Sequence, residues 1–277
     1  MNDRVREMWD RGRKVYQLGF GESRFPVASG VAEAMRASTH RRSYLPALGI
    51  EELREVIAQF YERRFQMVVC PGQVVIGPGS KSLLYALIMA LGEEVILPQP
   101  SWVSYSTQAQ IVGKPVLSVP MRFGSAYSLE VEVLWEELVK ARANRRNPDL
   151  LIVNRPHNPT GTMMPPDRVQ ALAEFAREEQ LMVLSDEIYA LVDHGRIPHR
   201  SVAHFYPEGT IVLGGLSKHL SLGGWRFGVA ILPAGSAGEK LGRTLQSIAG
   251  SIWSSVTAPV QYAALVAYSD DPGIESY

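Results

Sequence analysis

The sequence has 277 residues, of which 46% are hydrophobic, enough to build a large core in one domain, alone or with a small appendage. Lysine plus arginine and aspartate plus glutamate both total 28, so the formal net charge is zero. With no global field and no long basic run, the chain carries no electrostatic signature of a nucleic-acid or anionic-membrane partner. Any binding of an anion must therefore be local.

Cysteine usage and hydropathy exclude further classes. The single cysteine, Cys70, excludes an intrachain disulfide and a zinc site built from cysteines. The first ten residues are charged and lack an apolar signal core, and no apolar run approaches the length that crosses a bilayer. We expect a cytoplasmic protein with no membrane partner, no nucleic-acid partner and no metal.

In chain order, the first predicted elements are helical. Residues 1–26 suggest a short helix followed by an extended arm. Apolar residues then recur at helical spacing, and in the second such segment Leu53, Ile57 and Phe60 share one face. The segment 81–91 is apolar nearly all round, which predicts a buried helix. The complete set of helices expected after the arm is 27–37, 50–65, 81–91, 103–112, 131–143, 167–179 and 257–269.

Short, continuous apolar runs alternate with these helices. Such runs are typical of strands that crossover helices bury on both faces. We expect strands at residues 73–76, 94–97, 116–119, 150–153, 181–184, 211–213 and 229–232. The predicted fold is α/β: a large domain, residues 27–256, with an open, mostly parallel sheet, helices on both faces in three αβα layers, and a ligand crevice at the carboxyl ends of the strands.

The loop between the last two predicted strands carries one lysine, Lys218. A lysine there can reach over the strand ends, and desolvation would lower its pKa and make it a usable nucleophile. Arg226 follows eight residues later, and a guanidinium beside a reactive lysine suggests an anionic ligand such as phosphate. Judged from this stretch alone, an ordinary solvated lysine is an equal alternative.

Two other strand ends carry glycine or aromatic signals. Ser80 and Lys81 follow Gly-Pro-Gly at the start of the buried helix, where backbone N–H groups bind anions. A P-loop is excluded because the lysine does not follow the required glycine. Trp102 leaves the next strand toward the crevice and either stacks on a flat ring or is a half-buried core residue.

Two more strand ends carry polar side chains. Asn158 lies in a rigid turn set by two prolines and a glycine, and it either faces the crevice or merely caps the turn. Asp186 ends a wholly apolar strand, where a carboxylate is costly unless it meets a cation or a donor. Tyr189 follows three residues later and can project beside it.

These motifs together resemble the fold-type-I pyridoxal-phosphate enzymes, and among them the class I and II aminotransferases. The resemblance runs from about residue 18 to residue 262 and rests on Asn-Pro-Thr-Gly at 158–161, Asp-Glu-x-Tyr at 186–189, and Ser-Lys at 217–218 with Trp-Arg-x-Gly at 225–228. It implies an enzyme that uses pyridoxal 5'-phosphate (PLP) to move an amino group from an L-amino acid to a 2-oxo acid by a ping-pong mechanism.

The resemblance also implies roles for the catalytic side chains. Lys218 is similar to the lysine that bonds covalently to the cofactor and later shuttles the Cα proton. Asp186 is similar to the carboxylate that keeps the ring nitrogen protonated, so that the ring accepts electrons. Asn158 and Tyr189 resemble the pair that hydrogen-bonds the phenolic oxygen, and Asn158 with the backbone of Gly21 would also meet substrate.

The remaining implied roles concern ring stacking, phosphate and the neighbouring subunit. Trp102 matches the aromatic residue that stacks on the ring. Ser80, Lys81 and Arg226 match the groups that hold the phosphate. Tyr44 matches a tyrosine that reaches the phosphate of the neighbouring subunit, which implies a homodimer with shared active sites.

Three departures from the family pattern stand out. Gly215 replaces a common serine or threonine on the phosphate. Ser23 and Arg24 replace a Pro-Asp pair, and Arg24 either recognises a substrate side chain or is solvated. The sequence stops at Tyr277, so residues 257–277 would only begin a linker helix toward a small C-terminal domain that holds the arginine for the substrate carboxylate.

Two alternatives to transamination remain at this stage. The same constellation serves PLP-dependent lyases, decarboxylases and synthases. A non-catalytic, ligand-sensing relative is disfavoured, because residues 1–26 are too short for a DNA-binding module and both Lys218 and Asp186 are present.

Overall fold

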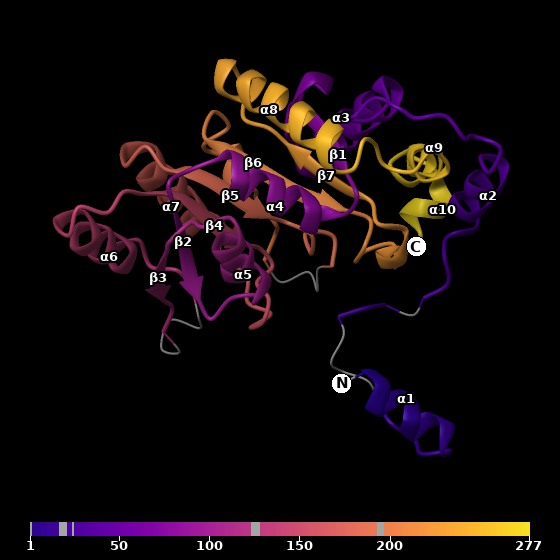
Figure 1. The fold of residues 1–277 in the computed structure, drawn as a ribbon, viewed down its shortest axis with the longest axis horizontal. Coiled ribbons are helices and arrows are strands. Elements are labelled where there is room, and N and C mark those ends of the chain that lie inside the picture. Colours follow the sequence, from indigo (N-terminus) through magenta and orange to yellow (C-terminus); the bar gives the residue numbers. More distant parts are fainter. Residues whose placement is uncertain (1, 17–20, 24, 123–127, 193–196) are drawn as a thin grey trace.

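A computed structural model describes residues 2–16, 21–23, 25–122, 128–192 and 197–277. These residues form one sheet of seven strands in the order β1-β7-β6-β5-β4-β2-β3 (Figure 1). The strands are β1 (Val74–Gly77), β2 (Glu94–Gln99), β3 (Val116–Pro120), β4 (Pro148–Asn154), β5 (Met182–Asp186), β6 (Thr210–Gly215) and β7 (Gly228–Ile231). Each of the seven overlaps a strand predicted from the sequence.

The sheet is mostly parallel, as predicted. The pairs β2–β3, β2–β4, β4–β5 and β5–β6 are parallel, whereas β7 runs antiparallel to both of its neighbours. Since β1 is also antiparallel to β7, its carboxyl end lies at the same edge as those of β2, β4, β5 and β6. The register places Asn154 beside Asp186 at that edge.

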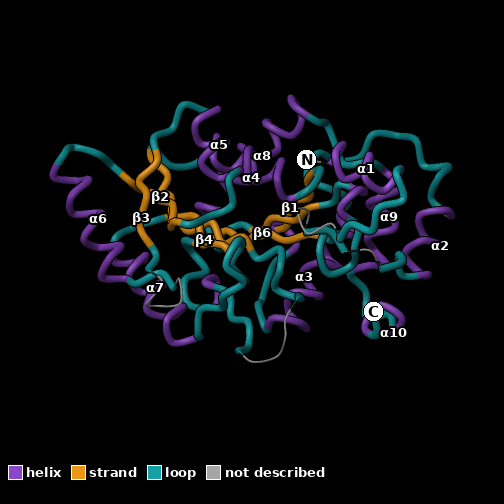
Figure 2. Tube along the Cα trace, turned by 90° about the horizontal axis from the view of Figure 1, so that it is seen from below, coloured by secondary structure: helices purple, strands orange, loops and turns teal. Residues whose placement is uncertain are grey.

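Helices cover both faces of the sheet (Figure 2). On one face, β1, β2 and β4–β7 pack against α4 (Ser80–Ala90), α5 (Ser104–Ile111) and α8 (Ser236–Ile252). On the other, α6 (Val131–Ala143) and α7 (Pro166–Glu178) cover β2–β5, while α3 (Glu51–Phe65) covers β1, β6 and β7. Alternating strand residues feed the two cores, as Leu184 and Val183 do, which explains the continuous apolar runs. The predicted three-layer αβα architecture is confirmed.

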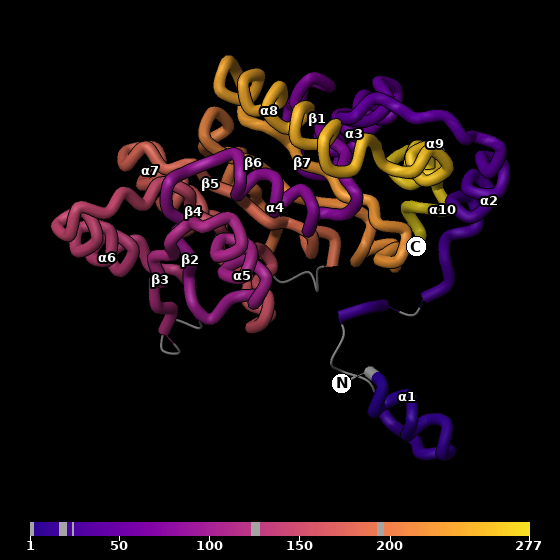
Figure 3. The backbone as a smooth tube through the Cα atoms, viewed as in Figure 1, coloured from indigo at the N-terminus to yellow at the C-terminus, as the bar shows by residue number. Residues whose placement is uncertain are grey.

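The last helices lie beside an early one. Figure 3 shows α9 (Ala258–Ala267) and α10 (Pro272–Glu275) next to α2 (Ser29–Ala37), although more than 200 residues separate them. The contact is close, since a Cβ on Gly30 would lie 3.5 Å from Val266 Cγ1. The division at residues 26 and 256 stays a prediction.

The helix predictions hold with small changes in bounds. The buried helix expected at 81–91 is α4, whose residues Leu83, Leu84, Leu87 and Ile88 are fully buried. The helix α8 was not predicted from the sequence. The predicted N-terminal helix is α1 (Asn2–Asp10), and Figure 1 shows it outside the three layers. Among the described residues, none of the helices is long and apolar enough to cross a membrane.

Candidate active site

A cavity of ≈ 950 Å³ lies at the carboxyl edge of the sheet. It brings together side chains from segments far apart in the chain, including most of the residues singled out in the sequence. Those that line it are Gly21, Ser80, Lys81, Trp102, Asn158, Asp186, Tyr189, Lys218 and Arg226, together with Glu22, Tyr105, Asn154, Ile188, Ser217, Gly223 and Gly224.

Asp186 is a buried carboxylate at the end of β5, only 5% exposed. Its Oδ2 accepts a hydrogen bond from the Tyr105 hydroxyl at 2.7 Å, and its Oδ1 accepts one from the Ile188 backbone at 3.2 Å. Burial raises the pKa of Asp186 to about 6, although these hydrogen bonds oppose the rise. The carboxylate is thus held firmly, but among the residues that the structure describes no cation contacts it directly, and a cationic ligand group can supply one.

The turn after β4 is tied to the Asp186 backbone. Asn154 Nδ2 donates to the Asp186 carbonyl at 2.9 Å, and Asn154 Oδ1 accepts from the Asn158 backbone at 2.6 Å. These bonds fix the rigid turn that presents Asn158 to the cavity. Burial and the charge of Asp186 raise the pKa of the Tyr189 phenol, whereas a hydrogen bond with the Asn158 side chain opposes the rise. The structure therefore places Asn158 and Tyr189 together, and their contact with a cofactor stays a prediction.

Lys218 lies half-buried in the loop after β6. Its Nζ donates to the Gly21 carbonyl at 2.6 Å and lies 5.5 Å from the centre of the Tyr189 ring. Burial lowers the pKa of the Lys218 amine, although the charges of Glu22 and Asp186 oppose the change. The amine is therefore in the cavity and easier to deprotonate than a solvated lysine, which excludes the surface-loop alternative.

The start of α4 forms a cradle for an anion. Gly79 has φ +86° and packs so closely against Arg226 that a Cβ would lie 2.1 Å from Arg226 Nη2. A Cβ on Gly228 would lie 2.3 Å from the Ser80 backbone nitrogen. Glycine at both positions lets the free backbone N–H groups of α4 and the guanidinium face the same space. Arg226 Nη1 is held by the Gly223 carbonyl at 2.7 Å.

Gly215 has a steric reason to lack a side chain. Its φ is +152°, and a Cβ would lie 2.7 Å from the Phe227 carbonyl oxygen. A serine or threonine hydroxyl cannot be added here without moving β7. Ser217, two residues on, lines the cavity and offers a hydroxyl.

The aromatic side chain of Trp102 and the ammonium group of Lys81 lie side by side in the cavity wall. Trp102 is partly buried against the core beside α4 and also lines the cavity, and its stacking on a flat ring stays a prediction. It meets Tyr105 edge to face, with 5.3 Å between ring centroids. The Lys81 ammonium lies 4.8 Å from the centre of the Trp102 ring. Lys81 thus brings a side-chain charge to the cavity in addition to the backbone N–H that the sequence suggested.

One predicted residue that the structure describes, Tyr44, does not line this cavity. Tyr44 is 90% exposed and does not line it, so within one chain it has no contact with the site. Its role toward a neighbouring subunit stays a prediction. Arg24 lies outside the described residues.

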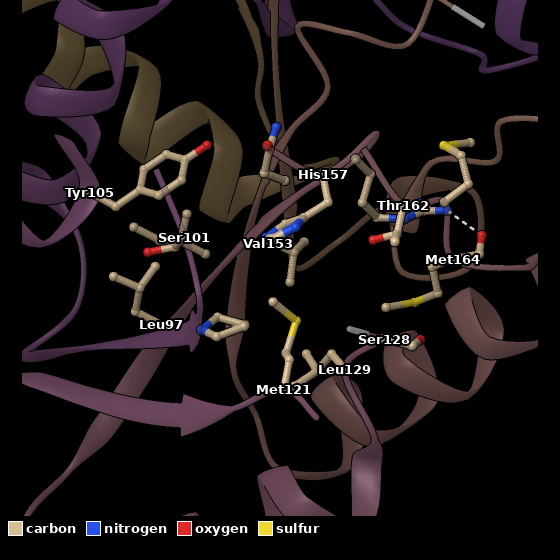
Figure 4. A pocket seen from close by; sticks show the side chains of 15 residues that line it. Leu97, Ser101, Tyr105, Met121, Ser128, Leu129, Val153, His157, Thr162 and Met164 are labelled. Atoms are coloured by element: carbon tan, nitrogen blue, oxygen red, sulfur yellow. Dashed lines mark hydrogen bonds between the residues drawn. The ribbon is translucent and has the colours of Figure 1, made fainter. Parts of the chain in front are cut away.

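A second, smaller cavity of ≈ 40 Å³ lies behind Tyr105 and Asn154. Figure 4 shows its largely apolar wall, including Leu97, Met121 and Val153. It contains neither the lysine nor the buried carboxylate, and it has room for only a few water molecules. We therefore assign the chemistry to the larger cavity.

Comparison with known proteins decides the family. A model of the aminotransferases of class I and II matches residues 13–277. The chain belongs to this family. It is 31% identical to an aspartate aminotransferase of Bacillus sp. (strain YM-2), over 96% of this chain and 67% of the relative, and 32% identical to an asparagine–oxo-acid transaminase of Streptococcus mutans, over 95% and 67%.

Solved aminotransferases share the fold. The aspartate aminotransferase of Thermus thermophilus with maleate superposes with a TM-score of 0.91 at 28% identity, over 99% of this chain and 70% of that one. The chain thus spans about two thirds of the length of these relatives.

Two polar residues of this aminotransferase site were missed in the sequence. Tyr105 follows Trp102 by three residues, a spacing that puts both on one side of a helix start, and this was the available signal. Asn154 is the last residue of β4 and lies outside the motif at 158–161, so no motif marks it. Both act on Asp186, which lies 81 and 32 residues further along the chain.

Proposed function

We propose that this aminotransferase binds PLP in the larger cavity and transfers an amino group from an amino acid to a 2-oxo acid. The observation that carries the proposal is the meeting, in one cavity, of a half-buried lysine amine, a buried carboxylate that no cation of the described residues contacts, and an anion cradle. These three features match three polar groups of PLP: its carbonyl, its ring nitrogen and its phosphate.

The residues fit the cofactor. Backbone N–H groups of Ser80 and Lys81, with the Arg226 guanidinium and the Ser217 hydroxyl, would hold the phosphate. Trp102 would stack on the ring, while Asn158 and Tyr189 would meet its phenolic oxygen. Bound PLP supplies a carbonyl that condenses with amines and a ring that accepts the electron pair left when Cα loses its proton.

Asp186 and Lys218 have distinct proton roles in this proposal. Asp186 holds a proton on the ring nitrogen, and Tyr105 keeps the carboxylate ionised by donating to Oδ2. Lys218 would bond to the carbonyl that PLP supplies, and its neutral amine would move the proton that the substrate Cα loses. Burial favours the neutral amine that this proton transfer needs. Gly21, whose carbonyl accepts from Lys218, would lie over the substrate.

The assembly and the substrates are further parts of the proposal. The exposure of Tyr44 supports a homodimer in which this tyrosine reaches the phosphate site of its neighbour. Aspartate and asparagine, which the relatives' names indicate, are the first amino donors to assay. We also propose a cytoplasmic location, consistent with the single cysteine.

A half-reaction tests the proposal. The purified protein with PLP is mixed with one amino acid in the absence of any 2-oxo acid. A transaminase loses the visible band of the bound cofactor, accumulates its amine form and releases one oxo acid per site. A lyase or decarboxylase would instead release carbon dioxide or an eliminated group and regain the band. The second outcome would refute transamination while leaving PLP binding intact; the relatives' names give it no support.

A further inference from the structure

Glu187 is a second buried acid directly beside Asp186, and the proposed chemistry does not use it. Both residues are 5% exposed. Asp186 lines the active-site cavity, whereas Glu187 borders a separate small cavity with Tyr61 and Gly214. Two adjacent buried carboxylates repel each other and cost free energy unless each finds partners.

Glu187 contacts two hydroxyl groups and a histidine ring. Oε1 of Glu187 accepts hydrogen bonds from the hydroxyls of Ser185 at 2.7 Å and Ser201 at 2.6 Å. Oε2 lies 2.8 Å from His199 Nε2, and the histidine side chain is only 5% exposed. Burial opposes the change, but His199 and Ser201 lower the pKa of Glu187, whereas burial raises the pKa of Asp186.

These contacts anchor a short turn that carries two residues of the proposed active site, Asp186 and Tyr189. The Glu187 backbone donates to the Leu213 carbonyl at 2.8 Å, and its carbonyl accepts from Ala190 at 2.9 Å. The turn holds Asp186 at its start and Tyr189 near its end. Side-chain bonds from Glu187 to the segment at 199–201 therefore tie the turn to a part of the chain outside the active site.

Resting on the proposed function, we propose that Glu187, held by His199 and Ser201, is a positioning residue that fixes Asp186 and Tyr189 against the cofactor ring. Glu187 does not line the cavity of ≈ 950 Å³. Its effect must therefore appear in the geometry of Asp186 and Tyr189, and not only in the stability of the fold.

Four variants of the purified protein test this inference. The readouts are the dissociation constant of PLP, the pH at the midpoint of the cofactor's visible absorbance change, and the Tm without PLP. Glu187→Ala is expected to weaken PLP binding by about tenfold, as loss of an outer-shell partner does at metal sites. The midpoint should also rise by about half a pH unit, since Tyr189 would stabilise the deprotonated form less well. Glu187→Gln keeps an oxygen for both serine hydroxyls and should restore most of the affinity.

The other two variants keep the test decisive. Ser201→Ala removes the hydrogen bond to Glu187 and the one that the Ser201 hydroxyl accepts from the Ala203 backbone, and we expect about threefold weaker PLP binding with a smaller rise of the midpoint. Glu208→Gln, which breaks the exposed ion pair with Arg177, is the matched control and should change neither readout. Variants at Glu187 and Ser201 that lower Tm but leave PLP affinity and midpoint at wild-type values would overturn the inference. A wild-type protein that does not bind PLP would instead overturn the proposed function.

Discussion

Replacing Asp186 by asparagine should stabilise the protein without PLP while destroying its affinity for PLP. The carboxylate is buried and its pKa rises from 3.8 to about 6. The unfolded chain then ionises at lower pH than the folded one, so ionisation opposes folding. This cost is absent below about pH 4, grows as the pH rises, and is fully present above about pH 6. At about 1.36 kcal/mol per pKa unit it amounts to roughly 3 kcal/mol.

Asparagine removes the charge and keeps an oxygen for the Tyr105 hydroxyl, which donates at 2.7 Å. Urea unfolding of wild type and Asp186→Asn, both free of PLP, should be followed from pH 4.5 to pH 7.5 or so. The variant should gain on wild type as the pH rises, reaching an advantage of about 2–3 kcal/mol at the upper end. A stability difference that does not change with pH, or a wild type that is the more stable at neutral pH, would refute the assigned cost of Asp186.

Three further substitutions probe the site. Tyr105→Phe removes a charge-assisted hydrogen bond from Asp186 and should cost about 2 kcal/mol, or roughly 30-fold in PLP affinity by fluorescence titration; unchanged affinity would deny Tyr105 its role. Arg226→Lys keeps the charge but loses the forked pair of N–H donors. Affinity for PLP should therefore fall about tenfold relative to affinity for pyridoxal, which lacks the phosphate. Gly228→Ala forces a Cβ to within 2.3 Å of the backbone at the start of α4 and should lower the free energy of unfolding by about 1–3 kcal/mol. Its control, Gly250→Ala in α8, meets no atom within 4 Å and should stabilise by about 0.5–1 kcal/mol.

The fold was largely predictable because burial is encoded locally. A strand covered on both faces needs apolar residues throughout. Six of the seven described strands are buried along nearly their whole length, whereas the edge strand β3 alternates between buried and exposed residues. The helix α8 shows the limit of this signal. Its buried residues form only a narrow stripe, Gly238, Leu241, Leu245 and Ala249, within a segment rich in glycine and polar residues. The antiparallel direction of β7 was also beyond local pattern, since it depends on how the loop after β6 returns to the sheet.

The site was predictable only where a motif named the residue. Lys218, Asp186 and Arg226 lie in short motifs, and the structure brings all three to one cavity. Tyr105 contacts Asp186 across 81 residues, and His199 contacts Glu187 from beyond the turn. Residue spacing predicts neither contact, because the two partners belong to different elements and only tertiary packing brings them together.

Reductive trapping at Lys218 tests the central claim most directly. The protein is incubated with PLP, reduced with borohydride and digested, and the peptides are analysed by mass spectrometry. We predict a pyridoxyl group on the peptide that contains Lys218, and no specific labelling in the Lys218→Ala variant. A label on another lysine, or equal labelling of the variant, would contradict the assignment of Lys218 as the residue that bonds to the cofactor.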